Sequence, residues 1–177
     1  MLTIDPRRSL LLIVDFQSKL MPVIHDGEIA VRNTSRLLAA ARLIHVPRLF
    51  TEQNSKGLGS TVEDLPIQTD RVIHKQSFDA CREGGLLDHV PVDGHVIVAG
   101  CEAHVCVQQT VLGLLAASRK IYVVRDAIGS RFPQDKETAI RRMEGHGAEI
   151  VTTEMVLFEW TQTAEHPHFR QMLALIK

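Results

Sequence analysis

The sequence predicts an α/β protein with three layers: a doubly wound, six-stranded parallel sheet, with helices on both faces. Two observations predict this class: the alternation of strand and helix patterns, and the apolar composition of the strands. Six short apolar runs alternate with segments of helical periodicity, and such alternation favours parallel strands joined by right-handed crossovers. The expected strand order is 3-2-1-4-5-6. Because no repeat, low-complexity tract or linker interrupts the pattern, we expect one domain over residues 1–177.

The predicted strands are short and rich in Val, Ile and Leu, which is typical of strands buried on both faces of a sheet. In chain order they are Ser9–Val14, Arg48–Thr51, Arg71–His74, His95–Ala99, Lys120–Val124 and Glu149–Val151.

The predicted helices carry apolar residues on one side at helical spacing. They cover Glu28–His45, Leu86–Val90, a segment beginning near His104, Gln134–His146, Thr153–Trp160 and a short stretch after Pro167. The polar segment Glu52–Gly59 is predicted to be a loop. It follows the second strand at its carboxyl end, where open α/β sheets bind ligands.

Composition excludes several function classes. The chain is 45% apolar with a formal net charge of −1 and 5% aromatic residues, which is a poor basis for binding nucleic acid. Three cysteines at irregular spacing fit a reducing compartment better than a disulfide framework. No apolar run approaches the ~20 residues of a membrane helix. We therefore expect a soluble, cytoplasmic protein without nucleic-acid or membrane partners.

Cys106 lies where a buried strand turns tightly into a helix. The amides of a helix start are unpaired and carry partial positive charge, so we expect a lowered thiol pKa. The same amides can hold the oxyanion of a tetrahedral intermediate. A small apolar residue closing a helix–strand contact explains the cysteine equally well, so this stretch alone leaves both interpretations open.

Two charged residues follow other predicted strands. Asp15 ends the first strand and Lys75 follows the third. Taken singly, a loop carboxylate and a solvated lysine would explain them. In the predicted strand order, however, the first and fourth strands are neighbours at the switch point. Asp15 and Cys106 then face one crevice, and the long side chain of Lys75 can reach it, which predicts a catalytic site.

Several motifs extend along the chain: Leu11–Gln17, Lys75 with Phe78, Val96–Gly100 leading into His104–Val107, and Val123–Ala127. Together they resemble the isochorismatase-like cysteine hydrolases, from the first strand to the last helix. The resemblance is closest to the short isochorismatase-domain proteins, which share Thr51–Gln53, Glu102–His104 and His166–Pro167.

The resemblance implies a hydrolase with an Asp15–Lys75–Cys106 triad acting on a small amide, carbamoyl or related acyl compound. Asp15 is then the general base, Lys75 stabilises the negative charge, and Cys106 forms an acyl-enzyme. The backbone amides of Glu102 and Cys106 form the oxyanion hole, and the Cys101–Glu102 peptide is cis. The alternative is a binding or scaffold protein that retains the pocket without turnover.

We expect Phe16, Gln53 and Phe78 to line the substrate pocket, although either phenylalanine is as well explained as core. Two roles stay open for the Glu102 side chain: it either contacts the substrate or accepts hydrogen bonds within its own turn. No metal is expected, because Thr51–Asn54 lacks the acid and histidine cluster of metal-binding nicotinamidases. Without a GxGxxG fingerprint, we expect no NAD, ATP or other cofactor. The resemblance implies a homo-oligomer, either dimer or tetramer.

Overall fold

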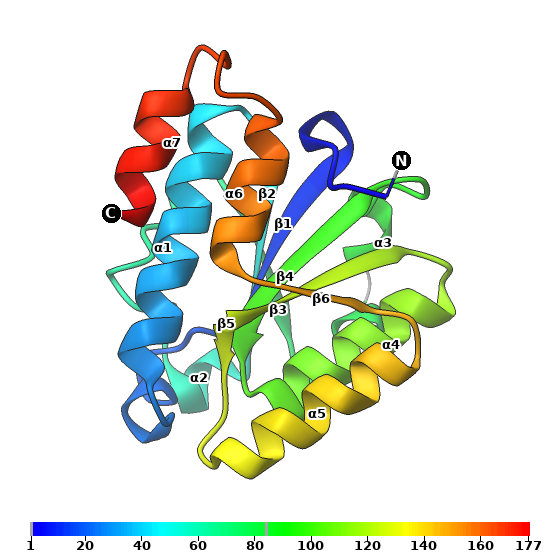
Figure 1. Cartoon of the computed structure of the whole chain (residues 1–177). Helices are drawn as coiled ribbons and strands as arrows, with labels where there is room; N and C mark the ends of the chain where they lie inside the picture. The colour runs from blue at the N-terminus through cyan, green and yellow to red at the C-terminus, as the bar shows by residue number, and fades with distance from the viewer. Residues whose placement is uncertain (1, 84) are drawn as a thin grey trace.

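The protein is described by a computed structural model that covers residues 2–83 and 85–177. Six parallel strands form one sheet in the order β3-β2-β1-β4-β5-β6, as predicted (Figure 1). The strands are β1 (Ser9–Val14), β2 (Arg48–Gln53), β3 (Arg71–Lys75), β4 (His95–Cys101), β5 (Lys120–Gly129) and β6 (Glu149–Val151).

Helices cover both faces of the sheet, which gives the predicted three layers (Figure 1). One face carries α1 (Gly27–Leu43), α6 (Thr153–Thr161) and α7 (Phe169–Ile176), and the other carries α3 (Leu86–His89), α4 (Gln108–Ala116) and α5 (Pro133–Gly145). The remaining short pieces are α2 (Ser55–Leu58), the 3-10 turns η1 (Pro6–Arg8), η2 (Met21–Val23) and η3 (Ala80–Arg82), and the π-helical turn η4 (Ala103–Val107).

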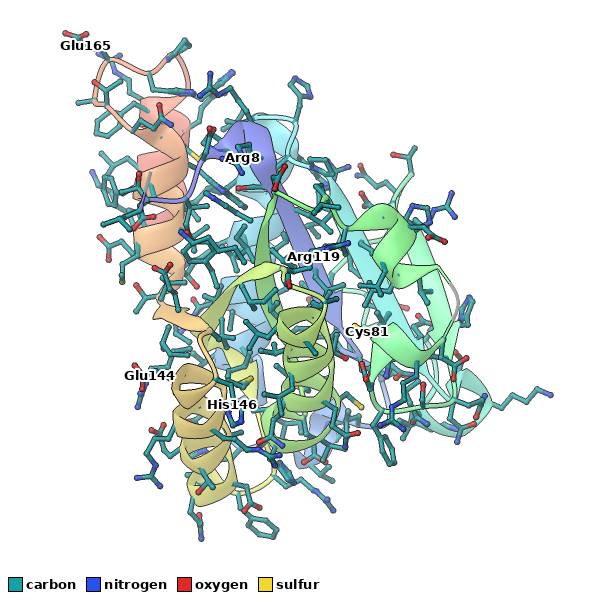
Figure 2. The ribbon with its side chains drawn as sticks, turned by 90° about the vertical axis from the view of Figure 1, so that its right-hand side faces the viewer. Arg8, Cys81, Arg119, Glu144, His146 and Glu165 are labelled. Atoms are coloured by element: carbon teal, nitrogen blue, oxygen red, sulfur yellow. The ribbon has the colours of Figure 1, made fainter. Side chains whose placement is uncertain are left out.

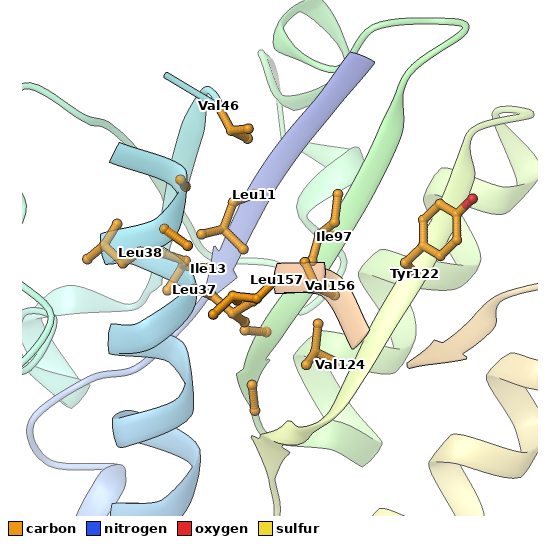
Figure 3. Packing of buried hydrophobic residues seen from close by; sticks show 14 of the residues in the cluster. Leu11, Ile13, Leu37, Leu38, Val46, Ile97, Tyr122, Val124, Val156 and Leu157 are labelled. Carbon is orange, nitrogen blue, oxygen red and sulfur yellow. The ribbon is translucent and has the colours of Figure 1, made fainter. Parts of the chain in front are cut away.

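Alternate residues of each central strand feed two separate cores. Leu11 and Ile13 of β1 pack toward α1 (Figure 3), whereas Leu10 and Leu12 belong to the core under α4 and α5. Burying each such side chain contributes roughly 1.5–3 kcal/mol. Because the side chains of β1 are packed on both faces of the sheet, the residue that follows this strand, Asp15, has a defined position at the carboxyl edge of the sheet.

The structure corrects several predicted boundaries. Strand β5 runs on past Val124 to Gly129, because a bulge in β5 lets Val98 pair with Val123 and Gly100 pair with Ile128. The helix expected from His104 begins instead as η4, and α4 starts at Gln108. The predicted polar loop after β2 is also shorter, since β2 reaches Gln53 and α2 follows it.

Asp126 lies in this bulge and has a structural role. Its Oδ1 accepts hydrogen bonds from the Thr153 amide at 2.8 Å and the Thr153 hydroxyl at 3.0 Å. The carboxylate therefore stabilises the amino end of α6. Across residues 2–83 and 85–177, no helix has both the length and the apolar character needed to cross a membrane.

Candidate active site

Asp15 lies at the carboxyl end of β1, in a backbone conformation with φ of 51°. Its residue surface is 1% exposed, and an unpaired carboxylate buried to this degree would be strongly destabilising. Two side chains offset the cost of burying this carboxylate. Lys75 Nζ lies 2.7 Å from Oδ2, and Thr51 Oγ1 lies 2.6 Å from Oδ1.

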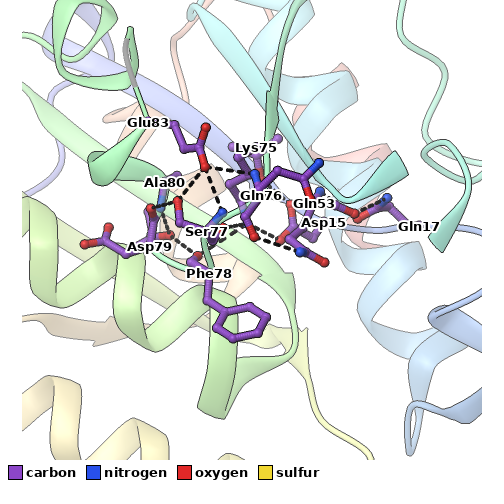
Figure 4. A network of polar contacts seen from close by, with 12 residues as sticks. Asp15, Gln17, Gln53, Lys75, Gln76, Ser77, Phe78, Asp79, Ala80 and Glu83 are labelled. Carbon is purple, nitrogen blue, oxygen red and sulfur yellow. Dashed lines mark hydrogen bonds and ion pairs between the residues drawn. The ribbon is translucent and has the colours of Figure 1, made fainter. Parts of the chain in front are cut away.

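Lys75 is the last residue of β3, and its side chain has no exposed surface. Besides the Asp15 carboxylate, its ammonium donates to the carbonyl oxygens of Ser77 at 3.2 Å and Phe78 at 3.3 Å (Figure 4). An ammonium has three hydrogens to donate, and all three have acceptors here. Lys75 is thus a fixed positive charge held against Asp15.

Cys106 lies in η4 and is 7% exposed. Burial and, after it, the Asp15 charge together raise the pKa of its thiol to about 12, whereas Lys75 acts to lower that pKa. Both charged groups therefore act directly on the sulfur. The lowered pKa expected from the helix start is wrong, because burial and the facing carboxylate outweigh the local amides. The sulfur is therefore a thiol beside the Asp15–Lys75 ion pair.

The turn that carries Cys106 is built around Glu102. The Cys101–Glu102 peptide is cis. The Glu102 carbonyl accepts from the amides of Val105 and Val107 at 3.1 and 3.2 Å, which closes the π-helical turn; such turns are frequent at functional sites. The Glu102 carboxylate accepts from the Arg131 amide at 3.1 Å and from Arg131 Nε at 3.0 Å. The side chain thus accepts hydrogen bonds from the segment after β5, whereas the alternative left open placed the donors within its own turn.

Two polar residues of the site were not singled out as site residues from the sequence. Thr51 binds Asp15 as described. Gln17 is fully buried, accepts from the Gln53 amide at 2.9 Å, and donates to the carbonyls of Gln53 at 3.0 Å and Gly59 at 2.6 Å (Figure 4). Thr51 lies near the carboxyl end of β2 and Gln17 follows β1, at the same edge of the sheet as Asp15, and this placement was the signal available.

Comparison with known proteins identifies the family of this arrangement. The model of the Isochorismatase domain matches residues 9–155. The chain belongs to the isochorismatase family. It is 34% identical to Isochorismatase domain-containing protein 2 of Danio rerio, over 98% of this chain and 89% of that protein.

Solved structures agree with this family. The MAR1 ribonuclease from Caenorhabditis elegans superposes with a TM-score of 0.92 at 34% identity, covering 98% of this chain and 92% of that chain. The ycaC gene product of Escherichia coli, an octameric hydrolase of unknown specificity, superposes with a TM-score of 0.87 at 22% identity, covering 98% and 96%. The protein therefore has the fold of isochorismatase family hydrolases.

The three expected pocket residues differ in position within this isochorismatase fold. Phe16 has no exposed surface and packs in the core on the α1 face, which is the alternative left open for it. Phe78 is 49% exposed, and its carbonyl binds Lys75 (Figure 4). The Gln53 side chain is partly buried and donates to the Gln76 carbonyl at 2.9 Å.

The remaining cysteines of this isochorismatase domain lie elsewhere. Cys81 lies beside α4, where its sulfur donates to the Thr110 carbonyl at 3.8 Å (Figure 2). Cys101 is fully buried at the end of β4. Burial raises the pKa of both thiols. Within the described ranges, no group of three or more His, Cys, Asp or Glu residues is arranged to hold a metal ion.

A large groove of about 1010 Å³ opens beside the amino-terminal half of α1, among Met21, Gly27 and Arg32. Its lining residues do not include Asp15, Lys75 or Cys106. The groove and the cysteine turn are therefore separate features of this isochorismatase fold.

Proposed function

We propose that this isochorismatase family protein is a cysteine hydrolase that cleaves a carbon–nitrogen bond in a small amide or carbamoyl compound. Asp15, Lys75 and Cys106 form its catalytic triad. The observation that supports the proposal most is the fully buried Asp15–Lys75 ion pair acting on the Cys106 thiol. Such a pair is costly to bury for stability alone, whereas it supplies a base and a balancing charge to a nucleophile.

In the acylation step, the Cys106 thiol proton passes to the Asp15 carboxylate while sulfur attacks the substrate carbonyl carbon. A carbon–sulfur bond forms, and the carbonyl π electrons move to oxygen. When the tetrahedral intermediate collapses, the carbon–nitrogen bond breaks and the proton on Asp15 goes to the leaving nitrogen. The products of this step are a thioester on Cys106 and a free amine or ammonia.

In the deacylation step, Asp15 takes a proton from water as the water oxygen attacks the thioester carbon. The carbon–sulfur bond then breaks, and the proton returns from Asp15 to sulfur. A carboxylic acid leaves, or a carbamic acid in the case of a carbamoyl substrate, and the thiol is restored. Lys75 remains charged throughout, because its role is to balance the negative charge that moves between Asp15 and Cys106.

In both steps, the proposed hydrogen-bond donors to the oxyanion are the backbone amides of Glu102 and Cys106, which belong to one turn. The fixed Glu102 carbonyl supports this assignment, since its bonds to Val105 and Val107 define the backbone around the cysteine. Gln53 and the exposed ring of Phe78 are the proposed substrate contacts at the mouth.

The test is a burst experiment with a panel of small amides, carbamoyl compounds and esters. Rapid quenching should show one equivalent of amine released ahead of steady turnover, and intact-protein mass spectrometry should locate the acyl group on Cys106. The variant Cys106→Ala should lose the burst. The matched control Cys81→Ala changes a half-buried cysteine of similarly raised pKa and should keep it.

Three outcomes would replace this proposal. A burst that persists in Cys106→Ala means that another group is the nucleophile. Ligand binding in the wild type without any turnover identifies a binding protein that retains the pocket. Because a MAR1 ribonuclease is among the similar structures, RNA is included in the panel. Cleavage of RNA that depends on Cys106 would assign the site to nucleic acid, against the expectation from the net charge of −1.

We also propose that the protein is a cytoplasmic homo-oligomer, a dimer or tetramer. An active thiol with two further free cysteines favours a reducing compartment. The octameric assembly of the Escherichia coli ycaC product supports self-association of the fold. Light scattering of the purified protein measures the number of subunits directly.

A further inference from the structure

We propose that Thr51 is a positioning residue for catalysis: its hydroxyl holds the Asp15 carboxylate ionised and directed toward the Cys106 thiol. This inference rests on the proposed function, because it concerns the base of the same site. Thr51 does not touch the sulfur or the substrate in this proposal, and it acts through Asp15.

Thr51 binds Asp15 at two points. It lies in β2, next to β1 in the sheet, and is 1% exposed. Its carbonyl accepts the Asp15 amide hydrogen at 3.1 Å, and its Oγ1 lies 2.6 Å from Asp15 Oδ1. One residue therefore fixes both the backbone and the carboxylate of the base. The branched threonine side chain has few rotamers available in a strand, which keeps the hydroxyl in place.

The direction of the hydrogen bond is determined by chemistry. An ionised carboxylate has no hydrogen to donate, so the Thr51 hydroxyl is the donor and Asp15 Oδ1 the acceptor. A hydrogen bond given to the charged form of an acid stabilises that form. The short distance is in the range of charge-assisted hydrogen bonds. Thr51 therefore favours the state of Asp15 that can accept the thiol proton.

The two carboxylate oxygens have separate partners. Oδ2 is held by Lys75, whose other two hydrogens go to the carbonyls of Ser77 and Phe78. Lys75 has no further hydrogen for Oδ1, and Thr51 donates its hydroxyl hydrogen to that oxygen. Because the two donors come from β2 and β3, they fix the plane of the carboxylate against rotation.

The other groups that face Asp15 do not duplicate this role. Its titratable neighbours are Lys75 from β3, Cys106 from η4 and Cys101 from the end of β4. Burial raises the pKa of the Cys101 thiol, so this neighbour is neutral. Removing the Thr51 hydroxyl therefore changes how Asp15 holds a proton without changing any charge of the site.

The experiment measures the alkylation rate of Cys106 by iodoacetamide as a function of pH, using the full chain and peptide mass spectrometry. Alkylation consumes the thiolate, so its rate depends on the proton acceptor beside the sulfur. In Thr51→Val, which keeps the side-chain shape, the pH of half-maximal rate should rise by about one unit, since one charge-assisted hydrogen bond is lost. Thr51→Ser restores the hydroxyl and should return the midpoint to within a few tenths of a unit of the wild type.

The matched control is Thr34→Val in α1, which removes a buried hydroxyl that has no hydrogen-bond partner among residues 2–83 and 85–177 and should leave the midpoint unchanged. Should Thr51→Val not fold, Thr51→Ala removes the same hydroxyl with less bulk. A folded variant without the hydroxyl and with an unshifted midpoint overturns the inference. Alkylation needs no turnover, so a shifted midpoint in a protein without a burst rejects the proposed hydrolase while the role of Thr51 stands.

Discussion

Lys75 Nζ lies 2.7 Å from Asp15 Oδ2, and neither side chain is more than 1% exposed. The two residues are 60 positions apart in the chain and come from strands separated by β2. The sheet thus creates a buried ion pair at its carboxyl edge from two residues that local sequence leaves unrelated. Substitutions can separate the contribution of this ion pair to the free energy of unfolding from its proposed contribution to activity.

Lys75→Met should destabilise the protein by about 3–5 kcal/mol, because it leaves the Asp15 charge buried without a counter-ion. The double variant Asp15→Asn with Lys75→Met should recover much of that loss and remain inactive. Urea unfolding measures both. The control Arg125→Met breaks an exposed pair with Glu137 and should cost less than about 1 kcal/mol. Equal losses at the two sites would contradict the burial argument.

Asp15→Asn should lower the pKa of the Cys106 thiol from about 12, because the Asp15 charge is the main cause of the rise after burial. The sign follows from charge: without the carboxylate, the thiolate faces Lys75 alone. Thiolate absorbance in the ultraviolet, followed against pH, should therefore appear at lower pH than in the wild type, although turnover is lost with the base. Asp79→Asn, next to Cys81, is the control and should not move the Cys106 transition.

Gly100→Ala should unfold the protein at lower urea concentration, because an added Cβ would lie 2.6 Å from the Val14 carbonyl oxygen and 3.0 Å from Val107 Cγ2. Overpacking of this kind costs about 1–3 kcal/mol or more. Gly145→Ala in α5 meets nothing within 4 Å and should stabilise the protein by up to about 1 kcal/mol. Similar effects of the two alanines would show that the strand β4 has more room than the structure describes.

His95 makes stability depend on pH. Burial lowers its pKa from the ordinary value of 6.5, and the charges of Lys120 and Arg8 lower it further. Its Nδ1 accepts the Asp5 amide hydrogen at 3.0 Å, so the folded ring is neutral. The unfolded chain binds this proton first, and stability should fall as pH drops below about 6.5, by at most about 1.4 kcal/mol per pH unit.

Urea midpoints at pH 7 and pH 5 test this dependence. His95→Asn keeps an acceptor but cannot be protonated, so its midpoint should change less between the two pH values than that of the wild type. The exposed His146 provides the control His146→Asn, which should retain the wild-type dependence. A variant at position 95 that loses stability as steeply as the wild type would assign the effect to another group.

The sheet order could be predicted from the sequence because it depends on the alternation of strands and helices. The family could be predicted because it depends on short sequence motifs. Alternation of buried strands and helices determines the crossovers, and the order determines which strand ends are neighbours. The meeting of Asp15 with Lys75 follows from that order once the reach of a lysine side chain is allowed. Those inferences required no knowledge of side-chain packing.

The remaining features depend on contacts that a linear pattern does not contain. Either the pocket or the core explained Phe16 from the sequence, and its place in the core on the α1 face becomes visible only in the packed structure. The thiol pKa was inferred from the helix start alone, whereas burial and the opposed charge of Asp15 dominate. The role of Thr51 becomes visible only when β2 is paired with β1 in register.

The central position of β1 couples reactivity to the completion of folding. Until β4 pairs with β1, the latter is an edge strand, and η4 with its sulfur has no fixed place near the carboxylate. A chain interrupted before residue 95 would contain Asp15 and Lys75 but not Cys106, the proposed nucleophile. On the proposed function, reactivity therefore requires that β4 be paired with β1.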